Sequence, residues 1–439
     1  MKYVTETKHV PLGFGEIAGG ALDGQAVTLK GAVHSLRAMG GITFLALRVR
    51  DGAVQCVCRP EELPEGLCEE CAAVVTGTVR REERAPGGRE LAAEEVRVLS
   101  RPAAPMPVAV SKRRLRLNLD TELSLRPLVL RSLRIRSVFK VQEGISRAFR
   151  EYLTAQGFTE IHTPKIVHAG AEGGSNIFRL DYFGRKAFLA QSPQFYKQTM
   201  VGSFQRVFEI GPVFRAEKHS TPRHLNEYTG LDLEMGFIDS FYDVMEVEAG
   251  FLKYCMELLA REYSEDLKRL EAELPRVDRI PCVRFDEAKR LAAEKYGRPI
   301  RDPFDLEPEE EANIGRYFQE EYGADFVFVT HYPSKKRPFY AMDDPEDPRC
   351  TLSFDLLFRG MEVTTGGQRV HDYQAQVAKM EARGMHPEEF RDFLTIHQHG
   401  MPPHGGLGIG LERLTMKLCG LENVREASLF PRDQSRLEP

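Results

Sequence analysis

The sequence contains no tryptophan, no long apolar run and no pattern of a secretory signal. A membrane-spanning helix needs about 18 or more apolar residues in succession, and the N-terminal MKYVTETKHVPLGFGE lacks the apolar core of a signal peptide. We therefore expect no membrane attachment and a reducing, cytoplasmic setting in which the eight cysteines are free thiols. The alternative is a zinc site with suitable ligand spacing, formed by Cys56, Cys58, Cys68 and Cys71.

A strong charge imbalance is also absent. The formal net charge is −5 over 439 residues, which argues against a dedicated nucleic-acid coat protein. The apolar content of 42% can form a large core, and at about 150 residues per domain the chain should hold two or three domains. No G-x-x-x-x-G-K-[ST] segment occurs, so a P-loop nucleotide site is excluded.

Residues 25–100 have the pattern of a small β domain. The segment GITFLALRVRDGAVQCVC reads as two strands around an Asp51-Gly52 turn, and further alternating segments flank it. This pattern predicts a five-stranded OB barrel within a domain of residues 1–104. Such barrels bind single-stranded nucleic acid by stacking bases on aromatic side chains. Phe44 is the candidate, with a place in the barrel core as the alternative.

A Pro/Ala-rich stretch, RPAAPMPVAV at 101–110, marks a domain boundary. Between 112 and 140, nine Lys and Arg residues are opposed only by Asp120 and Glu122. We interpret residues 105–136 as a basic hinge that contacts an RNA backbone, and the alternative is a solvated helix face.

Residues 137–439 mix helical segments with blocks of strands, which predicts an antiparallel α+β domain. A helix with a stop at Gly157 is predicted by apolar residues at helical spacing, namely Val138, Val141, Ile145, Phe149 and Leu153. Residues 262–345 are charged and weakly patterned, and we expect a helical insertion with little chemistry.

Two segments carry separate signals: the first has the pattern of an edge strand, and the second gathers a cluster of cations. GFTEIHTPKI at 157–166 reads as a strand containing Pro164, which would confine it to an edge or interface. FRAEKHSTPRHLNEYTGLDLEM at 214–235 places Arg215 and Glu217 on one face of a strand and gathers further cations in a loop. That arrangement suits a triphosphate, with a surface hairpin as the alternative.

Two further segments carry carboxylates and glycines. SFDLLFRGMEVTTGGQRVHDY at 353–373 places Asp355 and Glu362 one hairpin apart, which suits Mg²⁺ beside phosphates, and Gly366-Gly367 permits close approach of a ligand. GMPPHGGLGIGLERLTMKL at 400–418 is a glycine-rich strand that runs into a helix bearing Arg413. A flat ring could lie against these glycines while the guanidinium covers it or holds a phosphate.

Together these segments resemble the ordered motifs of the class II aminoacyl-tRNA synthetases: TPKI resembles motif 1, FRAE…RHLNE motif 2 and GIGLER motif 3. With the N-terminal barrel, residues from about 24 to 437 are similar to the archaeal-type aspartyl-tRNA synthetases. The resemblance implies a homodimer that attaches L-aspartate to tRNA through an aspartyl-adenylate, with ATP as substrate and Mg²⁺ as cofactor.

The resemblance also implies individual roles. The catalytic group would be Arg215, Glu217 and Arg413. Mg²⁺ would be bound by Glu362, Asp355 and Thr365. ATP would be contacted by Arg215, Ala216, Glu217, Arg223, His224, Leu225, Glu362, Gly410, Leu411, Glu412 and Arg413. Aspartate would be contacted by Glu172, Gln194, Phe195, Tyr196, Lys197, Arg215, Thr365 and Arg369.

Asparaginyl relatives lack a lysine at the position of Lys197, so the resemblance favours aspartate. If asparagine bound, Lys197 and Arg369 would be left as two uncompensated cations. Such a buried charge costs roughly 3–5 kcal/mol.

The tRNA preference is implied by the barrel. Relatives strict for tRNA(Asp) tend to carry Trp and Lys where this sequence has His34 and Pro86. We therefore expect an enzyme that also aspartylates tRNA(Asn), whose product an amidotransferase would convert. The anticodon would be contacted by His34, Phe44, Gln55 and Pro86. The main alternative is a ligase strict for tRNA(Asp); an asparagine-forming amide synthetase and an inactive RNA-binding regulator are favoured less.

Overall fold

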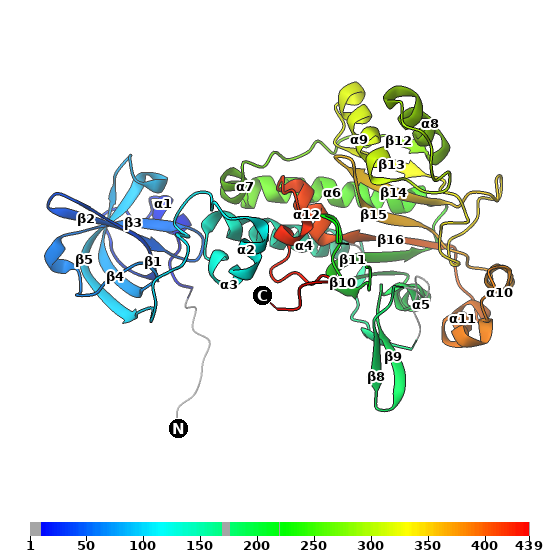
Figure 1. The fold of residues 1–439 in the computed structure, drawn as a ribbon, viewed down its shortest axis with the longest axis horizontal. Coiled ribbons are helices and arrows are strands. Elements are labelled where there is room, and N and C mark those ends of the chain that lie inside the picture. Colours follow the sequence, from blue (N-terminus) through cyan, green and yellow to red (C-terminus); the bar gives the residue numbers. More distant parts are fainter. Residues whose placement is uncertain (1–9, 169–175, 219, 439) are drawn as a thin grey trace. The chain divides into compact units, whose positions relative to one another are not determined.

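The computed structural model describes residues 10–168, 176–218 and 220–438, and the chain divides into two compact units between residues 135 and 136 (Figure 1). Residues 105–135 of the expected hinge fall within the first unit, and residue 136 begins the second. Within the described ranges, no helix has the length and apolar character needed to cross a membrane.

The first unit is a closed five-stranded barrel, as predicted. Its strands are β1 (Ala26–Met39), β2 (Ile42–Arg48), β3 (Ala53–Cys58), β4 (Ala72–Arg81) and β5 (Arg89–Ser100), in the order β1-β2-β3-β5-β4. Asp51, at the β2–β3 turn, accepts hydrogen bonds from the backbone of Phe14 (2.6 Å) and Gly15 (2.9 Å) in helix α1 (Phe14–Ala18). The turn carboxylate thus fixes the start of this helix against the barrel.

The basic segment is only partly available to RNA. It contains the short helices α2 (Leu119–Ser124) and α3 (Arg126–Val129). Arg126 is 1% exposed and pairs with Glu122 at 3.0 Å, and Arg131 pairs with the buried Glu70 at 3.0 Å. These two cations stabilise the first unit, so the expectation of an RNA-facing charge does not hold for Arg126.

The second unit is built on an eight-stranded sheet in the order β12-β13-β14-β15-β16-β11-β10-β6. Its strands are β6 (Thr159–Glu160), β10 (Arg206–Phe214), β11 (Glu227–Gly236), β12 (Cys282–Arg284), β13 (Phe326–Thr330), β14 (Ser353–Phe358), β15 (Met361–Gln368) and β16 (His404–Gly410). The central pairs are antiparallel, as expected, whereas the edge pairs β6–β10 and β12–β13 are parallel. A separate sheet holds β7 (Ile166–Val167), β9 (Arg185–Leu189) and β8 (Arg179–Tyr182).

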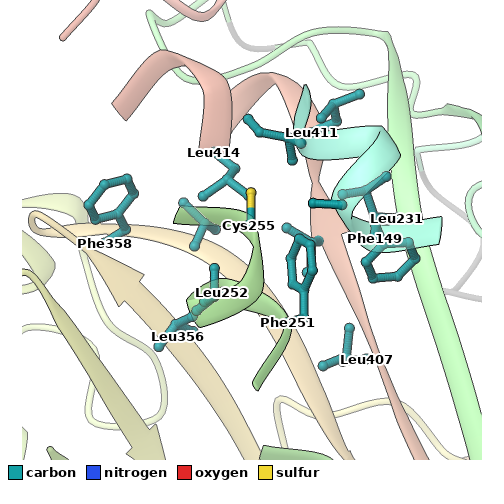
Figure 2. Packing of buried hydrophobic residues seen from close by; sticks show 14 of the residues in the cluster. Phe149, Leu231, Phe251, Leu252, Cys255, Leu356, Phe358, Leu407, Leu411 and Leu414 are labelled. Carbon is teal, nitrogen blue, oxygen red and sulfur yellow. The ribbon is translucent and has the colours of Figure 1, made fainter. Parts of the chain in front are cut away.

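Helices accompany this sheet. The helices are α4 (Leu133–Ala155), α5 (Gln194–Phe204), α6 (Tyr242–Glu262), α7 (Ser264–Leu270), α8 (Phe285–Tyr296), α9 (Pro308–Tyr322), α10 (Tyr373–Ala382), α11 (Arg391–Gln398) and α12 (Leu411–Leu418). Four of them, α4, α6, α7 and α12, share one large apolar core with the strands of the sheet, whereas α8 and α9 contribute to a separate apolar cluster. Figure 2 shows side chains of α4, α6 and α12 meeting side chains of the sheet strands. The rings of Phe149 and Phe251 meet edge to face, with centroids 5.0 Å apart.

Two sequence-based expectations need correction. The segment 157–166 is not one strand: Pro164 lies in irregular chain between β6 and β7, because proline lacks the N–H that a sheet ladder needs. The segment 262–345 is not purely helical: it supplies β12 and β13 to the main sheet, besides α7, α8 and α9. The short lengths of these strands hid them among charged residues.

Candidate active site

A cavity of about 1150 Å³ opens in the second unit and gathers residues from strands far apart in the sequence. Predicted site residues that line it are Gln194, Lys197, Arg215, Glu217, Arg223, His224, Leu225, Asp355, Glu362, Thr365, Arg369, Gly410, Glu412 and Arg413. The antiparallel hairpins β10–β11 and β14–β15 lie on either side of β16 in the sheet, so their side chains converge here.

Some predicted contacts lie elsewhere. Phe195 and Tyr196 do not line the cavity, since successive helix residues point in different directions and only Gln194 and Lys197, three residues apart, share the inward face of α5. Phe195 instead packs into a cluster of phenylalanine rings. Ala216 and Leu411 are also outside the lining, with Leu411 in the apolar core. Glu172 lies outside the described residues.

The loop between β10 and β11 carries the predicted phosphate-binding cations. Its two ends are tied together by Asn226, whose side chain donates to the backbone oxygens of Arg215 (2.7 Å) and Glu217 (3.1 Å). The Arg215 side chain is 41% exposed, and its guanidinium lies 3.9 Å from the Glu217 carboxylate, which is also 3.6 Å from His224. Arg215 is therefore accessible to an anion from the cavity.

A β-bulge aims the carboxylate of Glu362 into the cavity. The β14–β15 register pairs Leu356 with Thr364 but Leu357 with Glu362, so one extra residue of β15 lies between them. Without the bulge, residues 362 and 365 would face opposite sides of the sheet. With it, the Thr365 hydroxyl donates to the Glu362 carboxylate at 3.1 Å. Spacing alone did not reveal this shift.

Asp355 and Glu362 form an acidic pair of a kind that Mg²⁺ selects. Asp355 pairs with Arg337 at 2.8 Å; burial raises its pKa to about 6, with Arg337 opposing the rise and Glu362 adding to it. Burial also raises the pKa of Glu362, but Arg413 and Arg215 outweigh this effect and keep it below its usual value. Two oxygen-donor carboxylates at one cavity wall fit Mg²⁺, which takes few protein ligands and completes its shell with phosphate and water. Sequence reasoning missed Arg337.

Glu311 of α9 is a second residue that sequence reasoning missed. Its Oε2 accepts from the Arg223 guanidinium (2.5 Å) and from the backbone N–H of Glu362 (2.8 Å). Burial raises the pKa of Glu311 to about 7, against the effect of Arg223 and with that of Glu362. It arises from the segment that we expected to carry little chemistry, and no local motif distinguishes it.

Two further cations that line the cavity, Lys197 and Arg369, pair with two buried carboxylates. The Lys197 Nζ lies 2.9 Å from Asp232 and donates to the Leu407 oxygen at 2.8 Å, and the Arg369 Nε lies 2.8 Å from Glu234. Burial raises the pKa of Asp232 despite Lys197, whereas Arg369 and Lys197 overcome burial and lower that of Glu234. Lys197 and Arg369 thus already have carboxylate partners within the protein. Bound asparagine would therefore not leave them uncompensated, which corrects the expected basis for selecting aspartate.

The glycines of β16 leave space for the carboxylates of Asp232 and Glu234. A Cβ at position 406 would collide with the Glu234 carboxylate, and one at 408 would lie 3.1 Å from the Asp232 oxygen. Gly366 and Gly367 likewise make room for the Phe354 ring and the backbone of residue 352. The glycines were predicted to admit a ligand, but those at 406 and 408 admit side chains that hold the substrate-site cations.

In the barrel, His34 is only 8% exposed, and its Nδ1 lies 3.3 Å from the Arg48 guanidinium. Arg48 in turn forms a bidentate ion pair with Glu70 (2.6 and 2.7 Å). The Gln55 amide donates to Glu90 at 2.8 Å. His34, predicted to contact the anticodon, is thus part of a shielded polar cluster in the barrel.

The other two barrel candidates are more accessible. Phe44 lies outside the barrel core, half-buried, with the Arg37 guanidinium 5.2 Å from its ring centre. Pro86 is exposed in a short turn. Cys68 and Cys71 have sulfurs 3.5 Å apart, and among the residues described no group of three or more metal-ligating side chains gathers.

Comparison with known proteins adds independent information. Residues 118–434 match the family model for class II tRNA synthetases (D, K and N), and residues 27–99 match that for the OB-fold nucleic acid binding domain. The chain is 48% identical to the aspartate–tRNA(Asp/Asn) ligases of Thermus thermophilus and Deinococcus radiodurans; the matches cover 95% of this chain and 97% and 96% of the relatives. The crystal structure of asparaginyl-tRNA synthetase from Pyrococcus horikoshii complexed with asparaginyl-adenylate matches with a TM-score of 0.89 at 30% identity, covering 98% of this chain and 100% of that one.

Proposed function

Because this chain belongs to the class II tRNA synthetases of the D, K and N group, we propose that it attaches L-aspartate to tRNA in an ATP-dependent reaction through an aspartyl-adenylate. The observation that carries the proposal is a cavity whose lining combines the cations Arg215, Arg223 and Arg413 with Lys197 and Arg369, which pair with the buried Asp232 and Glu234. The names of the relatives from Thermus and Deinococcus support it.

Aspartate selection rests on hydrogen-bond donors. Lysine and arginine side chains carry donors and no acceptor. The side-chain amide of asparagine presents an N–H₂ that neither Lys197 nor Arg369 can accept, whereas both oxygens of an aspartate carboxylate can accept from them. Gln194 supports this role for the pocket, because the residue lines the cavity and its buried Nε2, a further donor, finds no hydrogen-bond partner in the described structure. The carboxylates of Asp232 and Glu234, which pair with these cations, suit the ammonium group of the substrate.

Adenylate formation is attack of the substrate α-carboxylate on the α-phosphorus of ATP, with pyrophosphate as the leaving group. Arg215 holds the α-phosphate and the α-carboxylate together, and Arg223 and Arg413 bind the outer phosphates. Negative charge grows on the phosphate oxygens in the transition state, so fixed cations in a partly buried cavity lower the barrier. Asp355 and Glu362 would hold Mg²⁺, which would supply further positive charge beside the phosphates.

The aspartyl group then passes from the adenylate to the terminal adenosine of tRNA, at the 3′-hydroxyl that the class II resemblance implies; the new ester bond replaces the acyl–phosphate bond, and AMP leaves. We propose that both tRNA(Asp) and tRNA(Asn) are charged, as the names of the relatives from Thermus and Deinococcus suggest for those proteins. Phe44 stacks on an anticodon base, and Gln55 contacts a base edge. The exposed Pro86 stands where relatives strict for tRNA(Asp) tend to carry a lysine. His34 contributes to this anticodon site as a member of the polar cluster that it forms with Arg48 and Glu70.

Three further parts of the proposal follow from this activity. A homodimer is supported by the exposed apolar side chains of Ile166, the last residue of the TPKI segment that resembles motif 1, and of Phe204 and Phe237. A cytoplasmic setting fits eight free cysteines in the structure. An amidotransferase would be the functional partner that converts Asp-tRNA(Asn).

The test is aminoacylation with [¹⁴C]aspartate on transcripts of tRNA(Asp) and tRNA(Asn), with [¹⁴C]asparagine as control. Comparable aspartylation of both tRNAs supports the proposal in full. Charging of tRNA(Asn) weaker by 100-fold or more, which corresponds to about 2.7 kcal/mol, shows a ligase strict for tRNA(Asp). Charging with asparagine instead contradicts the assigned amino acid.

A further inference from the structure

Glu311 connects two parts of the active site that no sequence motif joins. Its Oε2 accepts hydrogen bonds from the guanidinium of Arg223, on the β10–β11 loop, and from the backbone N–H of Glu362, on β15. Arg413 makes the same connection a second time, because it donates to the backbone oxygens of Arg223 and of Glu362, each at 3.2 Å. Arg223 and Glu362 are therefore bridged twice, once by Glu311 and once by Arg413.

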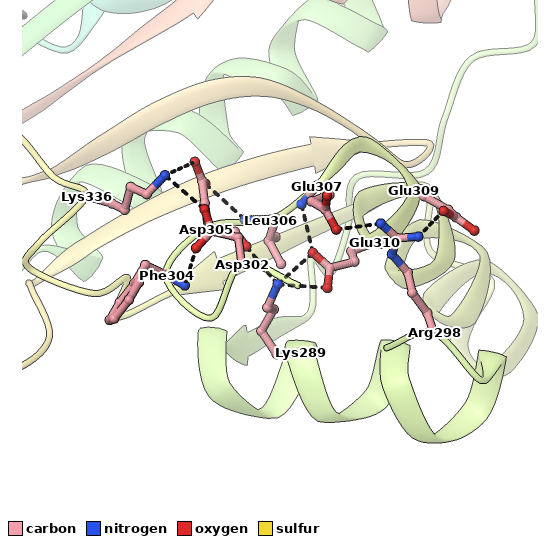
Figure 3. A network of polar contacts seen from close by, with 10 residues as sticks. All are labelled: Lys289, Arg298, Asp302, Phe304, Asp305, Leu306, Glu307, Glu309, Glu310 and Lys336. Atoms are coloured by element: carbon pink, nitrogen blue, oxygen red, sulfur yellow. Dashed lines mark hydrogen bonds and ion pairs between the residues drawn. The ribbon is translucent and has the colours of Figure 1, made fainter. Parts of the chain in front are cut away.

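The helix that carries Glu311 is fixed firmly at its start. The backbone N–H of Glu307 donates to Glu310 at 2.8 Å (Figure 3). Pro308 occupies the first helical position. The buried carboxylate of Glu310 accepts two hydrogen bonds from Lys289 of α8, at 2.8 and 2.7 Å. Arg298 forms ion pairs with Glu307 and Glu309 at the same end of the helix. These contacts leave the next residue, Glu311, little freedom to move along the helix axis.

Close packing then brings this helix onto the β14–β15 turn. Gly315 of α9 faces Gly360 of the turn so closely that a Cβ on Gly315 would collide with the Gly360 backbone. Gly360 has φ +72°, and a Cβ there would lie 2.8 Å from the Cα of Ala312. The two glycines thus let α9 approach the strand that carries Glu362, and Glu311 reaches the backbone of that strand. The Glu311 side chain is 7% exposed.

We propose that Glu311 is a positioning residue for ATP: it holds the Arg223 guanidinium at a fixed place relative to Glu362, so that the arginine and the metal-binding carboxylate meet the same phosphate chain. This inference rests on the proposed adenylate-forming activity. Arginine loses considerable rotamer freedom when it is ordered on a ligand. A carboxylate that orders it beforehand reduces the cost at the time of binding.

The main test compares Glu311→Ala and Glu311→Gln with the wild type in aspartate-dependent ATP–pyrophosphate exchange. For Glu311→Ala we expect the KM for ATP to rise about tenfold or more, with kcat within about threefold and the KM for aspartate within about twofold. Glu311→Gln keeps an acceptor but loses the charge, so its KM for ATP should rise by an intermediate factor. Glu321→Ala, at the exposed end of the same helix, is the matched control and should leave all three constants unchanged.

A double-mutant cycle shows whether Glu311 acts through Arg223. If it does, the KM for ATP of the Arg223→Ala/Glu311→Ala double variant equals that of Arg223→Ala within about twofold. Full addition of the two effects overturns the inference, as does an unchanged KM for ATP in a folded Glu311→Ala variant. If the alanine variant does not fold, as judged by its thermal melt, the glutamine variant decides by the same criterion. A wild type without exchange activity contradicts the proposed function instead.

Discussion

The Nζ of Lys197 lies 2.9 Å from the Oδ1 of Asp232, and both side chains are almost completely buried. The pair joins helix α5 to strand β11, and room for it exists because residue 408 of the neighbouring strand is a glycine. In the proposed amino-acid site each of the two cations, Lys197 and Arg369, therefore has a carboxylate partner before any substrate enters. An arriving aspartate adds its own carboxylate and ammonium to an existing set of ion pairs.

We predict that Lys197→Met strongly impairs aspartate binding. Methionine preserves much of the length but removes every donor, which leaves a buried carboxylate without its main partner. The KM for aspartate should rise about 100-fold or more, equivalent to about 2.7 kcal/mol, while the KM for ATP changes little. ATP–pyrophosphate exchange at varied aspartate measures this. Lys253→Met, on the exposed side of α6, is the control, and a rise below threefold in Lys197→Met would refute the assignment.

Glu362→Gln should weaken the use of Mg²⁺. The amide retains one oxygen but loses the negative charge that Arg413 and Arg215 stabilise. We expect the Mg²⁺ concentration for half-maximal exchange to increase about tenfold or more, and EDTA to abolish wild-type exchange. Magnesium titrations of the variant and of the exposed control Glu287→Gln supply the comparison. An unchanged magnesium requirement would remove Glu362 from the metal site.

Lys289→Ala should destabilise the catalytic unit far more than Lys295→Ala. Lys289 and Glu310 are 3% and 1% exposed, so deletion of the lysine leaves a buried carboxylate unpaired, which costs about 3–5 kcal/mol. The Lys295–Glu321 pair lies at the surface, where such pairs contribute about 0–1 kcal/mol. Urea unfolding of both variants measures the difference. Equal losses would show that the buried pair is no more stabilising than a surface pair.

The stability of Glu248→Gln should depend on pH in a defined direction. Burial raises the pKa of Glu248 to about 8, with its hydrogen bond from Thr364 opposing this and Asp355 contributing to it. The native state therefore keeps a proton that the unfolded chain loses near pH 4.5, so this residue's favourable contribution at low pH is lost as the pH rises toward 8. Glutamine does not titrate.

Relative to the wild type, Glu248→Gln should therefore gain about 2–3 kcal/mol in the free energy of unfolding between pH 5.5 and pH 8.5. Urea unfolding at the two pH values measures this change, with Glu246→Gln, on the same helix, as the control. A pH-independent difference between Glu248→Gln and the wild type would show that Glu248 is already ionised in the native protein.

Local chemistry in the sequence was sufficient for the architecture of the first unit. Alternation of apolar residues and the Asp51-Gly52 turn predicted the five barrel strands, because strand faces and tight turns depend on residues close in the chain. The same holds for Arg215, Glu362 and Arg413, whose motifs predicted residues that line the cavity. The strands β12 and β13 were missed, since the pairing partners that define short strands are distant in sequence.

Tertiary structure alone decided which charges meet. Asp232 and Glu234 stand next to Lys197 and Arg369 only because β11 pairs with β16 in one register, and glycines at 406 and 408 leave space for their side chains. A bulge in β15, not its sequence spacing, turned Glu362 toward Thr365. Sequence determined which groups the chain can offer, whereas strand register and close packing determined their partners, because ion pairs and hydrogen bonds depend on distances that only the folded chain sets.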